Sequence, residues 1–280
     1  MKQEILLTGG SGYLGSSILP ILLELGFKVT CLTNKTKIKK DNKQFSQLQL
    51  HEILESGFRP KIILHTATAY GRKDESDEEI YSTNYYLPNK LIESFDPNVF
   101  INCDTFLAKE TNNYASTKIR FVGDIYKKFE NKDLDMVFIN LKLQHFYGPG
   151  ARDTNFIIFL IKQMRSKTKE IKLTEGNQER DFIFIKDITN FFELLLTSLD
   201  KFQNGFSQIE IGSGKNIKIK ELVLLISKLL NYPENKLKFG EVQLRENEEL
   251  VSSVNLDKAF SLGWRPTTKI QEGLMETIKG

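Results

Sequence analysis

The sequence predicts an α/β protein whose main domain is a doubly wound parallel sheet, covered by helices on both faces. Two observations predict this class. Short apolar strands alternate with helical segments through the first half of the chain, and a glycine-rich stretch joins the first strand to the first helix. Such alternation is typical of βαβ units. The 280 residues suffice for one large domain, or for a domain with a smaller lobe.

The elements of the first half follow one another along the chain. Strands are expected at 4–8, 27–33, 61–69, 97–103 and 135–142, and helices at 11–26, 87–94 and 114–130. The strands are short apolar runs, as expected when a parallel sheet is buried on both faces. Residues 34–59 are polar and lysine-rich, with one helix-like piece at 45–56 and no clear third strand.

The pattern changes after residue 145. Helices are expected at 156–166, 187–199 and 219–230, and strands within 170–185 and 204–214. This mixed order predicts a smaller, mixed C-terminal lobe that interleaves with the last elements of the sheet. The expected boundaries are 1–145 with pieces near 177–212 for the first domain, and 146–176 with 213–280 for the second lobe.

Composition narrows the functional classes. The net charge is +3 with scattered lysines, so we expect no nucleic-acid partner. No apolar run is long enough to cross a bilayer, and the chain enters a strand at once, which leaves no room for a signal peptide. Two cysteines make no disulfide framework, and three distant histidines make no metal spacing. We expect a reduced, cytoplasmic protein without a metal.

The glycine-rich stretch is the first candidate binding site. Gly9, Gly12 and Gly15 follow the first strand and open the first helix, and 10–15 also reads G-x-G-x-x-G. Glycine allows a sharp turn and a close approach of a pyrophosphate, while the helix offers free N–H groups. This context indicates a Rossmann-type dinucleotide site rather than a purely structural turn. The expected contacts are Gly9, Gly12, Tyr13, Leu14 and Gly15.

The residues after the second strand bear on the choice of dinucleotide. An NAD site usually carries an acid about twenty residues beyond the glycines, bonded to the ribose 2′-hydroxyl. Here that position is Lys35, and the run that begins at Thr33 contains no acid before Asp41. A cation suits a 2′-phosphate, although lysines in a loop are often simply solvated. We therefore favour NADP(H) over NAD(H), with Asn34 and Lys35 near the ribose.

Tyr114 and Lys118 are the candidate catalytic pair. Four residues apart on a helix, they share one face. A nearby ammonium is expected to lower the pKa of a phenol, which would let the pair exchange a proton with a carbonyl oxygen. The same spacing occurs in two other places, each interrupted by a proline and neither opening a long helix: Tyr86 with Lys90, and Tyr232 with Lys236.

These motifs together resemble an extended short-chain dehydrogenase/reductase of the nucleotide-sugar epimerase, dehydratase and reductase group. The resemblance covers nearly the whole chain. It rests on the glycine stretch and the Tyr–Lys helix, with further matches at 65–68, 147–150, 176–188, 211–222 and 262–266. It implies that Thr66 and Ala67 contact the cofactor, and that the protein is a homodimer paired through helices that include the Tyr114 helix. His65 would pack beneath the cofactor.

The family also implies a Ser or Thr after the strand that precedes the tyrosine. The usual register puts Cys103 there, and a shift of two gives Thr105. Cysteine is a poor hydrogen-bond donor, so we favour Thr105. The Thr-Asp-Glu triplet of related dehydratases is absent, because Phe106 follows Thr105, which argues against 4,6-dehydration.

The short loop before Tyr114 is most similar to reductases of CDP-linked 4-keto dideoxyhexoses, of the abequose and paratose synthase kind. By the same resemblance, Arg180 and Arg245 would bind a nucleotide diphosphate and Asn84 would order the active site. Alternatively, both arginines form surface salt bridges and Asn84 caps a helix.

The predicted activity is an NADPH-dependent reduction of a nucleotide-linked 4-keto-(di)deoxyhexose in surface-polysaccharide sugar biosynthesis. Tyr114 would supply the proton, Lys118 would adjust the pKa of Tyr114, and Thr105 would polarise the carbonyl. Two alternatives stay open. One is an NAD-dependent nucleotide-sugar epimerase, and the other is a protein that senses the dinucleotide without catalysis.

Overall fold

A computed structural model describes residues 3–33, 38, 42–72, 75–107, 112–244 and 249–280. The chain divides into two compact units. Unit 1 comprises Met1–Leu143 and Phe191–Ile209, and unit 2 comprises Gln144–Asn190 and Glu210–Gly280. Helix α7 (Ile185–Leu196) carries the chain from unit 2 back into unit 1.

A seven-stranded sheet in the order β10-β6-β5-β4-β1-β2-β3 organises unit 1. The strands are β1 (Glu4–Thr8), β2 (Lys28–Leu32), β3 (Phe45–Leu48), β4 (Ile62–His65), β5 (Val99–Thr105), β6 (Val137–Leu143) and β10 (Gly205–Ile211). Strands β1 to β6 pair in parallel, and the strand order reverses between β1 and β4. This confirms the predicted Rossmann-type, doubly wound sheet.

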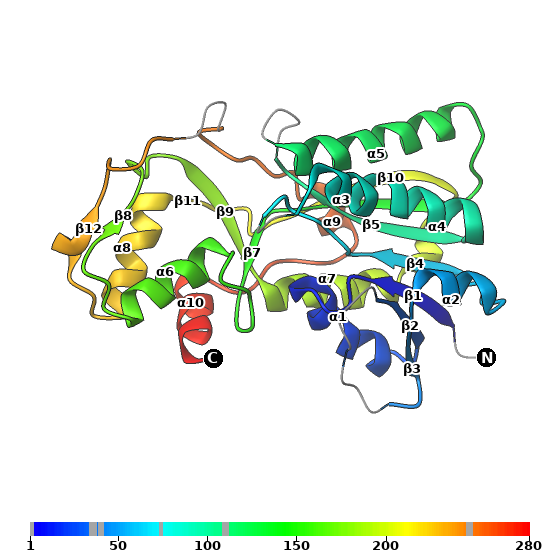
Figure 1. Cartoon of the computed structure of the whole chain (residues 1–280), viewed down its shortest axis with the longest axis horizontal. Helices are drawn as coiled ribbons and strands as arrows, with labels where there is room; N and C mark the ends of the chain where they lie inside the picture. The colour runs from blue at the N-terminus through cyan, green and yellow to red at the C-terminus, as the bar shows by residue number, and fades with distance from the viewer. Residues whose placement is uncertain (1–2, 34–37, 39–41, 73–74, 108–111, 245–248) are drawn as a thin grey trace. The chain divides into compact units, whose positions relative to one another are not determined.

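Helices cover both faces of this sheet. Figure 1 shows α1 on one face and α4 and α5 on the other. The helices of unit 1 are α1 (Tyr13–Glu24), α2 (Leu50–Glu55), α3 (Asp77–Tyr81), the π-helix η1 (Ser82–Tyr86), α4 (Leu87–Phe95), α5 (Asn113–Glu130) and the 3₁₀ turn η3 (Leu199–Lys201). Both faces are apolar, which accounts for the continuous hydrophobic runs of the strands.

The core between the sheet and α5 is built on a repeated tetrapeptide. Strands β5 and β6 both begin Val-Phe-Ile-Asn, at 99–102 and 137–140, and the two copies pair residue for residue. The Phe100 and Phe138 rings stack with centroids 5.5 Å apart, and Phe121 of α5 packs on both. Because the asparagines come next on the same face, the apolar core gives way to a buried polar layer towards the carboxyl ends of these strands.

Strand β3 is an element that the sequence pattern did not predict. Residues 45–56 read as one helix-like piece, but Phe45–Leu48 form an edge strand parallel to β2 and only Leu50–Glu55 are helical. The strand has four residues and none is fully buried. It therefore lacks the apolar run that marked the inner strands.

Unit 2 contains two small sheets and four α-helices among its described residues. One sheet has the order β11-β9-β7 and the other pairs β12 with β8. The elements are β7 (His145–Tyr147), α6 (Phe156–Arg165), β8 (Ile171–Lys172), β9 (Glu179–Phe184), β11 (Asn216–Lys218), α8 (Ile219–Leu229), the 3₁₀ turn η4 (Glu234–Lys236), β12 (Leu237–Lys238), α9 (Asp257–Ser261) and α10 (Ile270–Lys279). Residues 177–190, which the sequence analysis grouped with the first domain, belong here because β9 pairs with β7 and β11.

Two buried carboxylates join the sequence motifs of unit 2. Asp181 accepts hydrogen bonds from the backbone N–H groups of Ser213 and Gly214, each at 2.7 Å. Asp187 accepts from both the N–H and the hydroxyl of Thr267, at 3.0 and 2.9 Å. The Trp264 indole donates to the Asp187 carbonyl at 3.0 Å. The motifs at 176–188, 211–222 and 262–266 are thus parts of one hydrogen-bonded framework.

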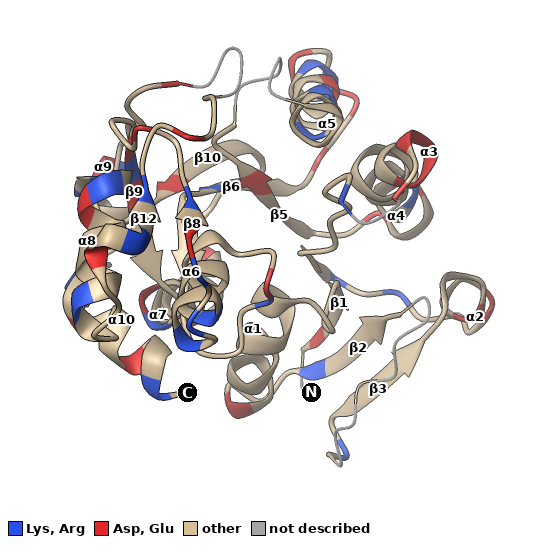
Figure 2. Ribbon diagram, turned by 60° about the vertical axis from the view of Figure 1, so that its left-hand side comes forward, with Lys and Arg blue, Asp and Glu red and all other residues tan. Residues whose placement is uncertain are grey.

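Charges are mixed on the helices of both units. Figure 2 shows basic and acidic residues interspersed along them, and on α5 Asp124 lies 3.9 Å from Arg120 and 3.8 Å from Lys127. Within the described part of the chain, no helix combines the length and apolarity that a membrane span requires. Cys31 and Cys103 are both free and buried.

Candidate functional site

The candidate site lies at the carboxyl ends of the central strands of unit 1, where the strand order reverses. Three segments meet there: the glycine loop after β1, residues 66–72 after β4, and the end of β5 beside the start of α5. Ligands of open parallel sheets bind in the crevice outside such a switch point.

The glycine loop has the shape of an anion cradle. Gly9 has φ +70°, and a Cβ there would lie 2.5 Å from the backbone nitrogen of Ala67. A Cβ on Gly15 would collide with the Gly9 carbonyl. Helix α1 begins at Tyr13 without a side-chain cap or an acid in its first turn, so its free N–H groups and dipole favour an anion. These residues fit the pyrophosphate of a dinucleotide.

Residues after β4 are tied to the end of β1. The Thr66 hydroxyl donates to the Thr8 carbonyl at 2.7 Å, and the Ala67 N–H donates to the Thr8 hydroxyl at 3.1 Å. The same hydroxyl lies 2.9 Å from Nδ1 of His65. Burial, with a contribution from the Lys118 charge, lowers the pKa of His65 to about 3, so this ring is neutral. His65 therefore packs within the site as an uncharged group.

Helix α5 carries Tyr114 and Lys118 to the end of β5. Asn112 caps the helix by accepting a hydrogen bond from the Ala115 N–H at 2.9 Å. The Lys118 ammonium is buried and donates to the Cys103 carbonyl at 2.6 Å, and it lies 6.0 Å from the centroid of the Tyr114 ring. Burial lowers the pKa of Lys118, and the nearby Asp104 carboxylate opposes that shift.

Thr105 is the residue whose side chain the structure places beside the Tyr114 hydroxyl, where it lowers the pKa of that phenol. The Leu107 N–H donates to the Thr105 hydroxyl oxygen at 3.1 Å and so orients it. Cys103 instead offers its carbonyl to Lys118, and burial raises the pKa of its thiol to about 12. Of the two registers left open by the sequence, the geometry around Tyr114 favours Thr105.

The phenol of Tyr114 holds its proton strongly. Burial raises its pKa above the ordinary value, the nearby Tyr70 raises it further, and the Thr105 side chain opposes both. This direction is opposite to the lowered pKa expected from the Tyr–Lys spacing. The reason is geometric, because the Lys118 ammonium is directed to the Cys103 carbonyl.

Tyr70 is a site residue that the sequence analysis missed. The centroids of the Tyr70 and Tyr114 rings lie 4.9 Å apart. The Arg72 guanidinium lies 5.2 Å from the centroid of the Tyr70 ring. Glu75 holds the loop by accepting from three successive N–H groups, those of Tyr70, Gly71 and Arg72, at 2.9, 2.9 and 3.2 Å. No spacing rule links Tyr70 to Tyr114, since 44 residues separate them.

Asn84 joins this loop to the tyrosine helix. It is buried on the π-helix η1, accepts from the Ala69 N–H at 3.0 Å and donates to the Ala69 carbonyl at 2.8 Å. It also donates to the Thr117 hydroxyl of α5 at 3.3 Å. Asn84 does not cap a helix; it orders the loop, and π-helical turns of this kind often occur at functional sites.

Of the other predicted substrate and ribose contacts, the structure describes Arg180. Arg180 is buried on β9 of unit 2, where it donates to the Glu179 carbonyl at 2.8 Å. Burial and the Arg180 charge lower the pKa of the neighbouring His145 to about 4. Three further predicted contacts, Asn34, Lys35 and Arg245, lie outside the described residues.

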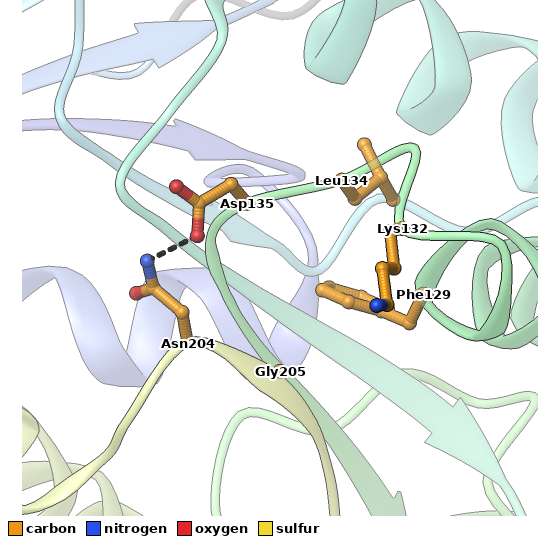
Figure 3. Close-up of a pocket in the computed structure, with 6 residues that line it drawn as sticks. All are labelled: Phe129, Lys132, Leu134, Asp135, Asn204 and Gly205. Carbon is orange, nitrogen blue, oxygen red and sulfur yellow. Dashed lines mark hydrogen bonds between the residues drawn. The ribbon is translucent and has the colours of Figure 1, made fainter.

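A separate hollow of about 450 Å³ opens near the C-terminus of α5, beside the amino ends of β6 and β10. Figure 3 shows Asp135 and Asn204 hydrogen-bonded on one side, at 2.6 Å, with Phe129, Lys132 and Leu134 on the other. It lies at the opposite end of β6 from the candidate site. Among the described residues, no cluster of His, Cys, Asp and Glu has the arrangement of a metal site.

Comparison with known proteins agrees with this geometry. The model of the NAD dependent epimerase/dehydratase family matches residues 5–212. The match spans well over half of the chain, so the protein belongs to this family. This confirms the resemblance found in the sequence, and with it the prediction of an enzyme of this dinucleotide-dependent group.

Relatives of similar length extend the comparison. The chain is 28% identical to a CDP-abequose synthase of Salmonella typhimurium, covering 100% of this chain and 98% of the relative. A CDP-abequose synthase of Salmonella muenchen is 29% identical, covering 99% and 98%.

Solved structures share the fold. A UDP-glucose 4-epimerase of Thermotoga maritima with UDP-glucose gives a TM-score of 0.83 at 20% identity, covering 99% of this chain and 98% of that one. A UDP-glucose 4-epimerase of Thermus thermophilus in complex with NAD gives 0.81 at 19% identity, also covering 99% and 98%.

His65 should make the protein sensitive to acid. Its pKa in the folded protein is about 3, below the 6.5 of an exposed histidine. The unfolded chain therefore takes up a proton that the folded one does not, and stability falls as the pH drops from about 6.5 towards 3. Between pH 7 and pH 5 the part of the loss in unfolding free energy that is due to His65 should be about 2 kcal/mol.

Urea unfolding of the parent and of His65→Gln at both pH values measures this loss. The variant should lose about 2 kcal/mol less than the parent between pH 7 and pH 5. His51→Gln, on the exposed surface of α2, is the matched control. An equal acid loss in the parent and in His65→Gln would contradict the assignment.

Proposed function

We propose that this protein is an NADPH-dependent reductase of a nucleotide-linked 4-keto-(di)deoxyhexose, acting in surface-polysaccharide sugar biosynthesis. The observation that carries the proposal is the grouping of Tyr114, Lys118 and Thr105 at the carboxyl end of β5. Such a group can deliver a proton to a carbonyl oxygen while a hydride reaches its carbon. The full-length similarity to CDP-abequose synthases supports the same class of substrate.

The cofactor would be held by unit 1. When bound, NADPH supplies the hydride. Its pyrophosphate fits the first turn of α1, with Gly9, Gly12, Tyr13, Leu14 and Gly15 around it. Thr66 and Ala67 lie beside Gly9 and would contact the cofactor next to this loop. Asn34 and Lys35 would bind the ribose 2′-phosphate, which is the reason for preferring NADP(H) to NAD(H).

Three side chains would perform the proton chemistry. Tyr114 donates its proton to the carbonyl oxygen of the substrate. Thr105, whose side chain lies beside that phenol, would turn its one hydroxyl proton to the same oxygen and so polarise the carbonyl. Lys118 would hydrogen-bond the ribose hydroxyls, and it would stabilise the phenolate left behind only after its ammonium turns from the Cys103 carbonyl towards Tyr114.

Recognition of the nucleotide would fall to arginines. A guanidinium binds phosphate oxygens in a bidentate manner, so Arg180 and Arg245 are proposed for the diphosphate. Asn84 contributes indirectly, by holding the Ala69 loop against α5. A CDP-linked sugar is favoured because the two full-length relatives are CDP-abequose synthases.

Tyr114→Phe should lower the turnover of a 4-keto sugar nucleotide about 1,000-fold, because it removes the proton donor. NADPH affinity should change little. Loss of NADPH absorbance with a panel of 4-keto sugar nucleotides measures the rate. Tyr86→Phe is the matched control, since Tyr86 precedes Lys90 with the same spacing but is 55% exposed.

The same assay separates the two candidates at the end of β5. Thr105→Val should slow the reaction about 10- to 100-fold, and Cys103→Ala should leave it within about threefold of the parent.

Epimerisation by purified protein without added cofactor would overturn the reductase in favour of the NAD-dependent epimerase. Full cellular function of Tyr114→Phe would favour the dinucleotide sensor.

Lys35 should set the preference for NADPH. Lys35→Ala should weaken NADPH binding about tenfold, because a charge-assisted contact to the 2′-phosphate is lost, and should leave NADH binding unchanged. Titration of cofactor fluorescence measures both constants, with Lys43→Ala as a control. Equal weakening of the two cofactors would remove Lys35 from the 2′-phosphate site.

A homodimer is proposed through α5 and the neighbouring helices. Tyr81, Tyr86 and Tyr126 expose 39, 55 and 48% of their surface, and the Arg120 guanidinium lies 4.8 Å from the Tyr85 ring centroid. Aromatic and arginine side chains of this kind are enriched in interfaces. Sedimentation velocity should give twice the 32.3 kDa of one chain, and Tyr126→Glu should favour the monomer. A monomeric parent at micromolar concentration would contradict the proposal.

A further inference from the structure

Asp104 is a buried carboxylate for which the proposed reaction has no role. It lies on β5 between Cys103 and Thr105, and only 8% of its surface is exposed. Its Oδ1 accepts from the Thr105 N–H at 2.8 Å, and its Oδ2 accepts from the Asn140 side-chain amide at 2.9 Å. A buried carboxylate costs free energy unless it is paired, so its position beside the Tyr–Lys site needs a reason.

A second amide fixes the direction of these bonds. Asn140 accepts at Oδ1 from the Asn102 side chain at 2.7 Å, and both asparagines are almost completely buried. With its oxygen occupied in this way, Asn140 presents its NH₂ group to Asp104. Both oxygens of the Asp104 carboxyl group therefore accept hydrogen bonds, which suits the ionised carboxylate.

The Lys118 ammonium lies near Asp104, because it donates to the carbonyl of Cys103, the residue that precedes Asp104 on β5. Burial disfavours that ammonium, and the Asp104 charge favours it. The other polar groups around Lys118 are Cys103 on the same strand, His65 on β4, and Tyr114 on its own helix. Of these four, Asp104 is the one that carries a counter-charge, because His65 is neutral and burial keeps the Cys103 thiol and the Tyr114 phenol protonated.

We infer that Asp104 is a positioning residue of this site, which places a negative charge beside the Lys118 ammonium and whose Oδ1 holds the backbone of Thr105 in place. Asn140 orients the carboxylate by donating to its Oδ2, and Asn102 in turn orients Asn140. Asp104 thus acts on two members of the Tyr114–Lys118–Thr105 group without touching the substrate. The inference rests on the proposed function for its catalytic consequence, while its effect on Lys118 belongs to the protein alone.

Two variants separate charge from structure. Asp104→Asn is nearly isosteric, but it removes the charge and sets an NH₂ group against that of Asn140. The double variant Asp104→Asn with Asn140→Asp restores a donor–acceptor pair, with the negative charge now on the neighbouring strand β6. It shows whether loss of this hydrogen-bonded pair accounts for any loss of stability in the single variant.

The first readout is the titration of Lys118, followed by NMR of protein labelled at the lysine side chains, with the signal assigned by its loss in Lys118→Met. Asp104→Asn should lower this pKa by about one unit or more, because an opposite charge nearby has been removed. The second readout is the alkaline limb of NADPH binding and of the reductase rate, which should move to lower pH by the same amount.

The double variant should regain the melting temperature of the parent. An unmoved Lys118 titration in Asp104→Asn would overturn the inference. If no 4-keto sugar nucleotide is reduced by the parent, the proposed function fails, and the NMR titration still decides the link between Asp104 and Lys118.

Discussion

A buried ammonium at the carboxyl ends of the central strands is the constraint around which unit 1 is arranged. Lys118 is 3% exposed and donates to the Cys103 carbonyl, so β5 must end within reach of the second turn of α5. Burying a charge is costly unless it is paired, and Asp104 supplies the opposite sign. The paired Phe-Ile-Asn segments of β5 and β6 produce this setting, because each places an amide directly after the aromatic core.

Buried carboxylates organise loops in both units. In unit 1, Asp104 holds the start of the loop after β5, and in unit 2 Asp181 and Asp187 hold the segments after β10 and α9. In each case the acceptor is an aspartate side chain, and at least one donor is a backbone N–H group. Such bonds are charge-assisted and directional, so they define loop shapes that apolar packing would leave loose.

The position of Tyr114 is determined by contacts with two other segments. Its ring packs on Tyr70, and its hydroxyl lies beside Thr105 at the end of β5. Glu75 holds the loop that carries Tyr70 by accepting hydrogen bonds from the N–H groups of Tyr70, Gly71 and Arg72. The phenol is therefore held in place by both the loop after β4 and the end of β5.

The sequence by itself determined the βαβ order, the glycine loop and the Tyr–Lys pair, because each depends on local periodicity or on spacing within one helix. It missed β3, whose four half-exposed residues lack an apolar run. The tertiary structure alone decided that Thr105 meets Tyr114, that Tyr70 packs on Tyr114, and that Asn140 orients Asp104. The last two contacts join segments more than thirty residues apart, and all three depend on strand register and on where each strand ends, which no local pattern encodes.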